Sequence, residues 1–213
     1  MIYLSGAVSP ALLASHRVDI GLMLNPDLGF TRAGRFEHLD RLAWAADNGC
    51  FSKGERFDPA AWGLWLEELG RHHRETCIFA VAPDVVGNAQ LTMARYHDYL
   101  GIINAAGLPA AFVIQDGQEA EGVPWDDCAA VFMGGTTAFK LSEAAYTIVR
   151  EARDRGKWRH MGRVNTSRRM MAAHAGLYDS ADGTFLRFGP DENLPRLCRW
   201  LDQVNAQTVM GAL

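Results

Sequence analysis

Residues 77–116, CIFAVAPDVVGNAQLTMARYHDYLGIINAAGLPAAFVIQD, contain a complete strand–helix–strand unit. The runs CIFAVAPD (77–84) and AAFVIQD (110–116) are continuously apolar until a polar residue ends each, as expected for parallel strands buried on both faces. Between them, Asn88 suits a helix N-cap, and Gly107-Leu108-Pro109 is a helix stop. Strands joined in this way by a helix indicate an α/β fold.

The same alternation extends over the whole chain. Six further runs predict strands: IYLSGA (2–7), VDIGLML (18–24), LAWAAD (42–47), AAVFMGG (129–135), WRHMGRV (158–164) and AGLYDS (175–180). Helical patterns and caps predict helices at 58–73, 88–105, 142–155, 167–174 and 191–205, with shorter pieces at 10–16 and 36–41.

Eight strands alternating with helices favour a small (β/α)8 TIM barrel that residues 1–213 form as a single domain. A doubly wound open sheet is the alternative. That fold is expected to carry a glycine-rich dinucleotide loop after the first strand, and SGAVSPALL (5–13) does not match GxGxxG.

The composition is that of an ordinary globular protein, with 48% hydrophobic residues in a chain of 213. No apolar run approaches the roughly 20 residues of a membrane span, and MIYLSGAVSP (1–10) lacks the pattern of a signal peptide. The four cysteines stand far apart without CxxC spacing, which favours reduced thiols over disulfides or a zinc site. We therefore expect a cytoplasmic protein without membrane contact.

The charge is unevenly distributed. The net charge is −4, which by itself argues against a nucleic-acid-binding protein. Residues 150–169, however, contain eight Arg or Lys residues against Glu151 and Asp154. Such a segment on an acidic body is either a phosphate-binding face or a solvated helix face.

Polar residues collect where the predicted strands end. In chain order they are Asp47, Asp84, Gln115 with Asp116, Gly134 to Thr137, Arg163 with Asn165 and Thr166, and finally Asp179 and Asp182. In a barrel these ends meet at one mouth, where converging carboxylates raise each other's pKa and are costly unless they bind something. A glycine pair also indicates close approach of the backbone to a ligand. This pattern predicts an active site. The histidines show no ligand spacing, so we assign no metal.

Six segments in this order resemble the tRNA-guanine transglycosylase superfamily, which exchanges a purine base in a polynucleotide by a covalent mechanism. They are ADNGCF (46–51), VAPD (81–84), FVIQDG (112–117), FMGGTTA (132–138), HMGRVNT (160–166) and GLYDSADGT (176–184). Each motif is weak alone, but six with compatible spacing are specific. The resemblance spans about residues 42–189.

The resemblance implies a nucleophilic aspartate, for which Asp182 fits best and Asp179 second. A carboxylate can trap the cation that develops at C1′ when the N-glycosidic bond breaks. Asp47 matches the residue that would handle protons as one base leaves and the next enters.

The resemblance also implies a set of residues that recognise the base. Asp84 would accept hydrogen bonds from N1–H and the exocyclic amine of guanine, and Gln115 and a backbone N–H near Gly134 or Gly135 would donate to O6. Phe51 and Met161 would sandwich the ring. Cys50 stands where the family would have glycine, and this sequence offers no reason for it.

Two departures from the family pattern point to a subgroup. Only Cys198 follows Asp182, so we expect neither the Cys-rich zinc site of the tRNA-modifying members nor any cofactor. The chain is also far shorter than those enzymes. Both features resemble the compact phage and bacterial relatives that insert 7-deazaguanines into DNA, which makes the host cytoplasm the expected location if a phage encodes the protein.

The expected reaction is therefore the replacement of guanine in DNA with a free 7-deazaguanine base of the preQ0 type. Phosphate contacts are expected from Lys157, Arg163, Arg168 and Arg169. Base exchange on tRNA or another RNA and hydrolysis by a nucleoside-cleaving glycosidase remain alternatives. A non-catalytic nucleic-acid-binding barrel is the alternative of another class. The sequence does not predict the oligomeric state.

Overall fold

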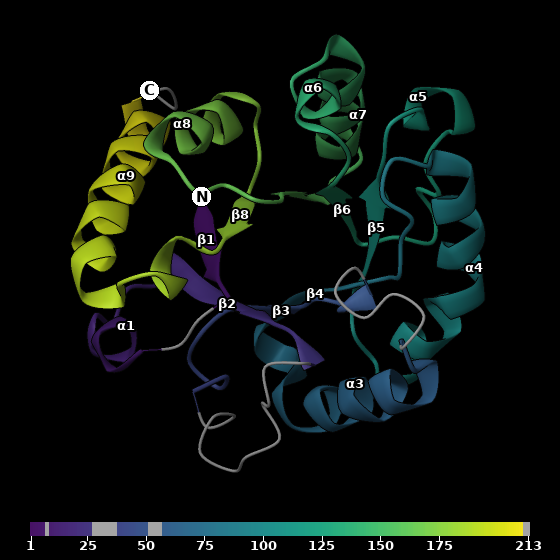
Figure 1. Ribbon diagram of the computed structural model, residues 1–213, viewed down its shortest axis with the longest axis horizontal. Coiled ribbons are helices and arrows are strands. Elements are labelled where there is room, and N and C mark those ends of the chain that lie inside the picture. The colour runs from purple at the N-terminus through teal and green to yellow at the C-terminus, as the bar shows by residue number, and fades with distance from the viewer. Residues whose placement is uncertain (7–8, 27–37, 51–56, 211–213) are drawn as a thin grey trace.

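The computed structural model describes residues 1–6, 9–26, 38–50 and 57–210. Eight parallel strands follow one another around a closed barrel (Figure 1). They are β1 (Ile2–Ser5), β2 (Ile20–Leu24), β3 (Trp44–Ala46), β4 (Cys77–Val81), β5 (Ala110–Ile114), β6 (Ala130–Met133), β7 (Trp158–Met161) and β8 (Ser180–Gly183). Strand β8 pairs with β1, from Ile2 opposite Ser180 to Ser5 opposite Gly183, and this pairing closes the barrel. The predicted α/β barrel is confirmed.

Figure 1 shows the helices arranged as a ring around the strands. The longer ones are α3 (Pro59–His73), α4 (Ala89–Ala105), α7 (Glu143–Asp154), α8 (Ser167–Ala175) and α9 (Pro190–Met210), and the shorter ones are α1 (Pro10–Ala14), α5 (Gln118–Glu121), α6 (Thr137–Lys140) and the 3₁₀ turns η3 (Arg74–Thr76) and η4 (Phe185–Arg187). Asp58, Asn88 and Ser142 cap α3, α4 and α7 through their side chains, as predicted. Across the described ranges, no helix is long and apolar enough to cross a membrane.

The last strand differs from the sequence prediction. The run at 175–180 contains the end of α8, its C-cap Gly176, and Leu177 with φ +66°, and β8 begins only at Ser180. Helix ends and short buried strands are both apolar, and an apolar run by itself does not separate them. The sequence SADG can form this strand because its polar side chains, Ser180 and Asp182, face the interior and hydrogen-bond with Trp158 and His160.

Three short elements also differ. Residues 38–41 of the helix predicted at 36–41 form a turn, and 36 and 37 lie outside the described residues. Helices α5 and α6 are not predicted from the sequence, because a single helical turn is too short to show a period.

Side chains alternate between the barrel interior and the helical layer along every strand. One buried apolar cluster fills the interior, and it comprises Leu4, Met23, Ala45, Phe79, Val81, Ala111, Val113 and Ala130, with Phe132 and Trp158 packed against it. A larger cluster joins the outer faces of the strands to the helices. The inward positions of β7 and β8 include polar residues, since His160, Ser180 and Asp182 stand there in place of apolar ones. The mouth of the barrel therefore has an apolar floor.

Candidate active site

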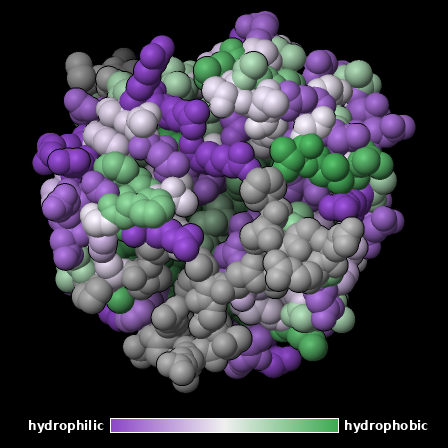
Figure 2. All heavy atoms as spheres, viewed as in Figure 1, coloured by the Kyte–Doolittle hydropathy of each residue, from purple (hydrophilic) through white to green (hydrophobic). Residues whose placement is uncertain are grey.

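One cavity of about 350 Å³ lies at the mouth formed by the C-terminal strand ends. Its lining includes three carboxylates from three elements: Asp47 after β3, Asp84 after β4 and Asp182 in β8. We call it the carboxylate cavity. Figure 2 shows hydrophilic residues along part of the rim of a central hollow in the same view. The other predicted residues in its wall are Gln115, Gly134, Gly135 and Arg163.

Asp182 is held through one of its two oxygens. His160 Nε2 lies 3.0 Å from Asp182 Oδ1, and the backbone N–H of Arg163 donates to the same atom over 3.2 Å. A Cβ at position 162 would lie 2.7 Å from the Phe132 ring and 3.4 Å from Asp182 Oδ1. Glycine at this position therefore leaves room beside Asp182. Because both contacts use Oδ1, Oδ2 is the oxygen left for a ligand.

His160 belongs to a chain of polar groups across β7 and β8. Trp158 Nε1 donates to Ser180 Oγ over 2.8 Å, and Ser180 Oγ lies 2.8 Å from His160 Nδ1. His160 is fully buried and packs against the rings of Phe79 and Phe132. If the Ser180 hydroxyl donates to Nδ1, the neutral imidazole carries its proton on Nε2 and donates it to Asp182.

Sequence reasoning gave His160 no role. The signal in the sequence was a spacing of two residues, which puts both members of a pair on the same face of a strand. Trp158 and His160 form one such pair, and Ser180 and Asp182 form another, and all four side chains lie inside the barrel. That signal can be read only once the true start of β8 is known.

Asp47 is half-buried at the end of β3, where Asn25 Nδ2 donates to its Oδ2 over 3.1 Å. Burial, followed by the charge of Asp182, raises the pKa of Asp47 to about 6. A carboxyl group with such a pKa exchanges protons near neutral pH. Asn25, which lies at the end of β2, was not identified from the sequence.

Asp84 accepts hydrogen bonds from three neighbouring side chains. Gln115 Nε2 donates over 2.7 Å, Asn48 Nδ2 over 3.5 Å and Cys50 Sγ over 3.7 Å. Burial raises the pKa of Asp84 despite these donors. The contact with Asp84 supplies the structural reason for Cys50 that the sequence lacked.

Gln115 supports Asp84 rather than facing a ligand alone. Its Nε2 donates to Asp84, its Oε1 accepts from the backbone N–H of Gly87 over 2.9 Å, and its side chain is buried. The sequence predicted a direct contact with the base. These contacts fix the Asp84 carboxylate, and they use one of the two hydrogens on Nε2. Gln115 also lines the carboxylate cavity, so its contact with the base stays a prediction.

The two glycines after β6 have different surroundings. The N–H of Gly134 donates to Ile114 O over 3.0 Å, which leaves the N–H of Gly135 as the donor for a ligand. Gly135 has φ +74°, and a Cβ there would lie 2.5 Å from Asp116 Oδ2. Asp116 accepts from the backbone N–H and hydroxyl of Thr136, so it is a capping residue at the start of α6.

No protein-family model matches the chain, and no curated protein matches its sequence. The barrel is a fold that commonly carries enzymes, with active sites at this end. In the described part of the chain, no group of three His, Cys, Asp or Glu side chains could hold a metal ion. The chemistry of the mouth is therefore inferred from its side chains.

Of the two residues predicted to sandwich the base, the structure places only Met161. Met161 is buried toward the helical layer, because its neighbours His160 and Gly162 face the interior, and it lines a separate cavity of about 120 Å³. It does not line the carboxylate cavity. Phe51 lies outside the described residues.

The predicted phosphate-binding residues fall into two groups. Arg163, Arg168 and Arg169 are exposed after β7 and at the start of α8, on the mouth side. Arg169 Nη1 donates to Arg163 O over 2.9 Å. Lys157 directly precedes β7 and therefore lies at the opposite end of the barrel, away from the carboxylate cavity.

Most of the remaining basic segment is neutralised locally. Arg150, Arg153 and Arg155 pair with the acidic residues Glu143, Asp154 and Glu151 of α7. Arg159 pairs with Asp179 over 2.5 Å at the N-terminal ends of β7 and β8. Asp179 is thus at the far end of the barrel, and of the two predicted nucleophiles only Asp182 lines the cavity.

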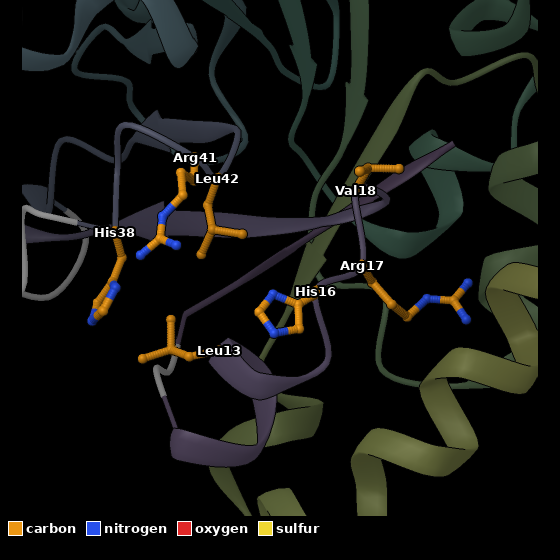
Figure 3. A pocket seen from close by; sticks show the side chains of 7 residues that line it. All are labelled: Leu13, His16, Arg17, Val18, His38, Arg41 and Leu42. Carbon is orange, nitrogen blue, oxygen red and sulfur yellow. The ribbon is translucent and has the colours of Figure 1, made fainter.

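A further cavity, of about 240 Å³, lies at the N-terminal end of the barrel (Figure 3). Its lining comes from residues that precede β2 and β3: Leu13, His16, Arg17, Val18, His38, Arg41 and Leu42. Arg17 points away from His16 in Figure 3, and it pairs with Asp19 and Asp202. None of the described residues that line this cavity is a carboxylate, so it is a weaker candidate than the mouth.

Proposed function

We propose that the protein is a base-exchange transglycosylase that replaces guanine in DNA with a 7-deazaguanine base of the preQ0 type. The observation that carries this proposal is the gathering of Asp47, Asp84 and Asp182 in one cavity of about 350 Å³. Base exchange needs a nucleophile, a proton carrier and an acceptor for the base edge, and the three environments suit these tasks. The resemblance to the transglycosylase superfamily supports the same reaction.

Asp182 acts as the nucleophile. Its Oδ2 attacks C1′ of the target deoxyguanosine, and the C1′–N9 bond breaks as the C1′–O bond forms. His160 and the Arg163 N–H hold Oδ1, which limits rotation of the carboxylate. His160 is a positioning residue in this scheme.

Asp47 carries the proton. In its protonated form it donates to N9 of the departing guanine, and it then accepts the N9 proton of the incoming 7-deazaguanine. The N9 of that base attacks C1′ and displaces the Asp182 oxygen, so the enzyme returns to its starting state. A pKa of about 6 suits a group that must both give and take a proton near neutral pH.

Asp84 recognises the base. Its carboxylate accepts from N1–H and the exocyclic amine, a pair of donors that guanine and its 7-deaza analogues share. Gln115 and Cys50 hold the carboxylate in place, and the Gly135 N–H donates to O6. The target nucleotide has to leave the helical stack to reach the cavity, and Arg163, Arg168 and Arg169 bind the neighbouring phosphates.

Trapping of the covalent intermediate tests the proposal. The protein is incubated with guanine-containing DNA and a competing 7-deazaguanine, denatured and resolved on a gel. We expect an adduct that survives denaturation in the wild type and in Asp179→Ala, and none in Asp182→Ala. Asp179 is the matched control because it lies close in sequence but at the far end of the barrel. Base exchange by Asp182→Ala at the wild-type rate would refute the assignment.

The same assay tests the positioning role of His160. His160→Phe should slow adduct formation with little change in KM, and His160→Gln, which retains a donor, should restore part of the rate.

The polymer and the released products separate the alternative functions. Release of labelled guanine from tRNA but not from DNA would favour the RNA enzyme, and release without incorporation would favour a glycosidase. Binding of DNA without release from either polymer would favour the non-catalytic barrel.

A further inference from the structure

The cavity of about 120 Å³ that Met161 lines adjoins the carboxylate cavity, and we call it the side cavity. It lies between the residues after β6 and those after β7. Four residues line both cavities: Gly135, Lys140, Gly162 and Arg163. A ligand that occupies the carboxylate cavity can therefore extend into the side cavity.

The two cavities have opposite electrostatic character. Three carboxylates line the first, whereas none of the described residues that line the side cavity is acidic. Among the described residues, its polar lining consists of Lys140, Arg163 and Arg169 with the threonines Thr136 and Thr137. The Thr136 hydroxyl already donates to Asp116, so Thr137 supplies the hydroxyl donor. Cations and hydroxyl donors in this combination bind phosphate oxygens.

Lys140 is the least expected member of this set. It ends the short helix α6, is only 8% exposed, and donates from Nζ to Gly162 O over 3.0 Å. Among the described residues, no carboxylate lies within ion-pair distance of Lys140 or Arg169. Asp182 and Asp116 attract the Lys140 ammonium group only from beyond ion-pair distance. A buried ammonium group without a direct counter-ion is costly, and an anion in the cavity would offset part of that cost.

The surroundings of Lys140 agree with an anion-binding role. Burial, followed by the positive charge of Arg163, lowers the pKa of Lys140 to about 8. An anion between these groups would relieve their repulsion and favour the charged ammonium. The apolar part of the lining, formed by Leu141, Met161 and Val164, suits the carbons of a sugar more than a second charged group.

We propose that the side cavity is a phosphate subsite, in which Lys140 and Arg169 bind a phosphodiester attached to the nucleotide whose base occupies the carboxylate cavity. The identity of that nucleotide rests on the proposed function. The anion site itself rests only on the cavity, its cations and the absence of acidic residues from its lining. The subsite would make the enzyme select a nucleotide within a strand over a free nucleoside.

The first test is independent of catalysis. Binding of inorganic phosphate is measured by calorimetry for the wild type, Lys140→Met and Lys157→Met. Lys140→Met should weaken binding at least tenfold, since charge-assisted hydrogen bonds are lost. Lys157→Met, which removes an equal charge at the other end of the barrel, should bind as the wild type does. Equal binding by the wild type and Lys140→Met would overturn the subsite.

The second test places the phosphate on the nucleic acid. Oligonucleotides carry one neutral methylphosphonate next to the target guanine, on its 5′ or its 3′ side, and their binding is measured. The methylphosphonate on one of the two sides should weaken binding of the oligonucleotide to the wild type about tenfold. The same methylphosphonate should not change the affinity of the oligonucleotide for Lys140→Met. Additive effects of the replacement and the variant would contradict the contact. Phosphate binding without any base exchange would refute the proposed function and leave the anion site intact.

Discussion

At the residue scale, the surroundings of each carboxylate set its chemistry. Asp182 receives both of its donors on one oxygen, whereas Asp84 is held by three side chains. Asp47 has Asn25 beside it and the charge of Asp182 nearby, and burial keeps its pKa at about 6. One residue type can therefore serve as nucleophile, base receptor and proton carrier in the same cavity.

Replacement of Asp47 should separate its effects on stability and on catalysis. Because the pKa of Asp47 is raised from 3.8 to about 6 in the folded state, its stabilising contribution is complete below pH 3.8 and is lost as the pH rises through 6. Asp47→Asn should therefore be more stable than the wild type by about 3 kcal/mol at pH 7.5 and nearly equal to it at pH 3.5. Base exchange should fall about a hundredfold or more, because an amide cannot carry the proton.

Urea unfolding at the two pH values measures this difference. Asp126→Asn, a change to an exposed carboxylate, serves as the control and should keep the pH dependence of the wild type. If the free energy of unfolding of Asp47→Asn changed with pH as that of the wild type does, Asp47 would not titrate between pH 3.5 and pH 7.5.

At the scale of elements, helices α3 and α4 pack closely through glycine. A Cβ at Gly70 in α3 would lie 2.0 Å from the carbonyl oxygen of Ala106, the C-cap of α4. Gly63, two turns earlier, packs against Ile102 with its Cβ position 3.1 Å away. The close approach lets both helices cover β4 and β5, whose C-terminal ends position Asp84 and Gln115.

A pair of glycine substitutions tests this contact. Gly101 lies in α4 with nothing within 4 Å of its Cβ position, so Gly101→Ala should stabilise the protein by about 1 kcal/mol through helix propensity. Gly70→Ala gains the same propensity but meets backbone, and it should destabilise the protein by about 1–3 kcal/mol. Thermal unfolding of both variants measures the difference. A gain in stability for Gly70→Ala would mean that the helices can separate at little cost.

At the scale of the whole molecule, a net charge of −4 coexists with a basic region beside the mouth. Arg168 and Arg169 are exposed there and have no carboxylate partner among the described residues. The arginines of α7 are equally exposed, but each pairs with an acidic neighbour. Positive potential is therefore concentrated near the carboxylate cavity rather than spread along the segment 150–169.

This distribution predicts which arginines control DNA binding. Reversal of both charges in Arg168→Glu/Arg169→Glu should weaken DNA binding and lower the slope of log K against log salt by about 2, since two phosphate contacts are lost. Arg153→Glu/Arg155→Glu makes the same change in net charge on α7 and should leave the slope nearly unchanged. Equal slopes in the two double variants would show that only the total charge matters.

The sequence by itself determined seven of the eight strands, the longer helices and most of the mouth. Buried strands are short and apolar, and helix caps act locally, so strand and helix positions were readable from residues such as Asn88 and Ser142. Asp47 and Asp84 were identified because each directly follows such a strand. These features depend only on neighbours in the chain.

Only the tertiary structure decided which alternate residues of β7 and β8 face the interior. The closed barrel pairs Leu4 with Asp182 and His160 with Ser180. This register turns Asp182 and His160 inward and Met161 outward, and it leaves Asp179 at the far end. A shift of one residue reverses every side chain of a strand, and pairing with both neighbouring strands fixes that shift, so local sequence does not determine it.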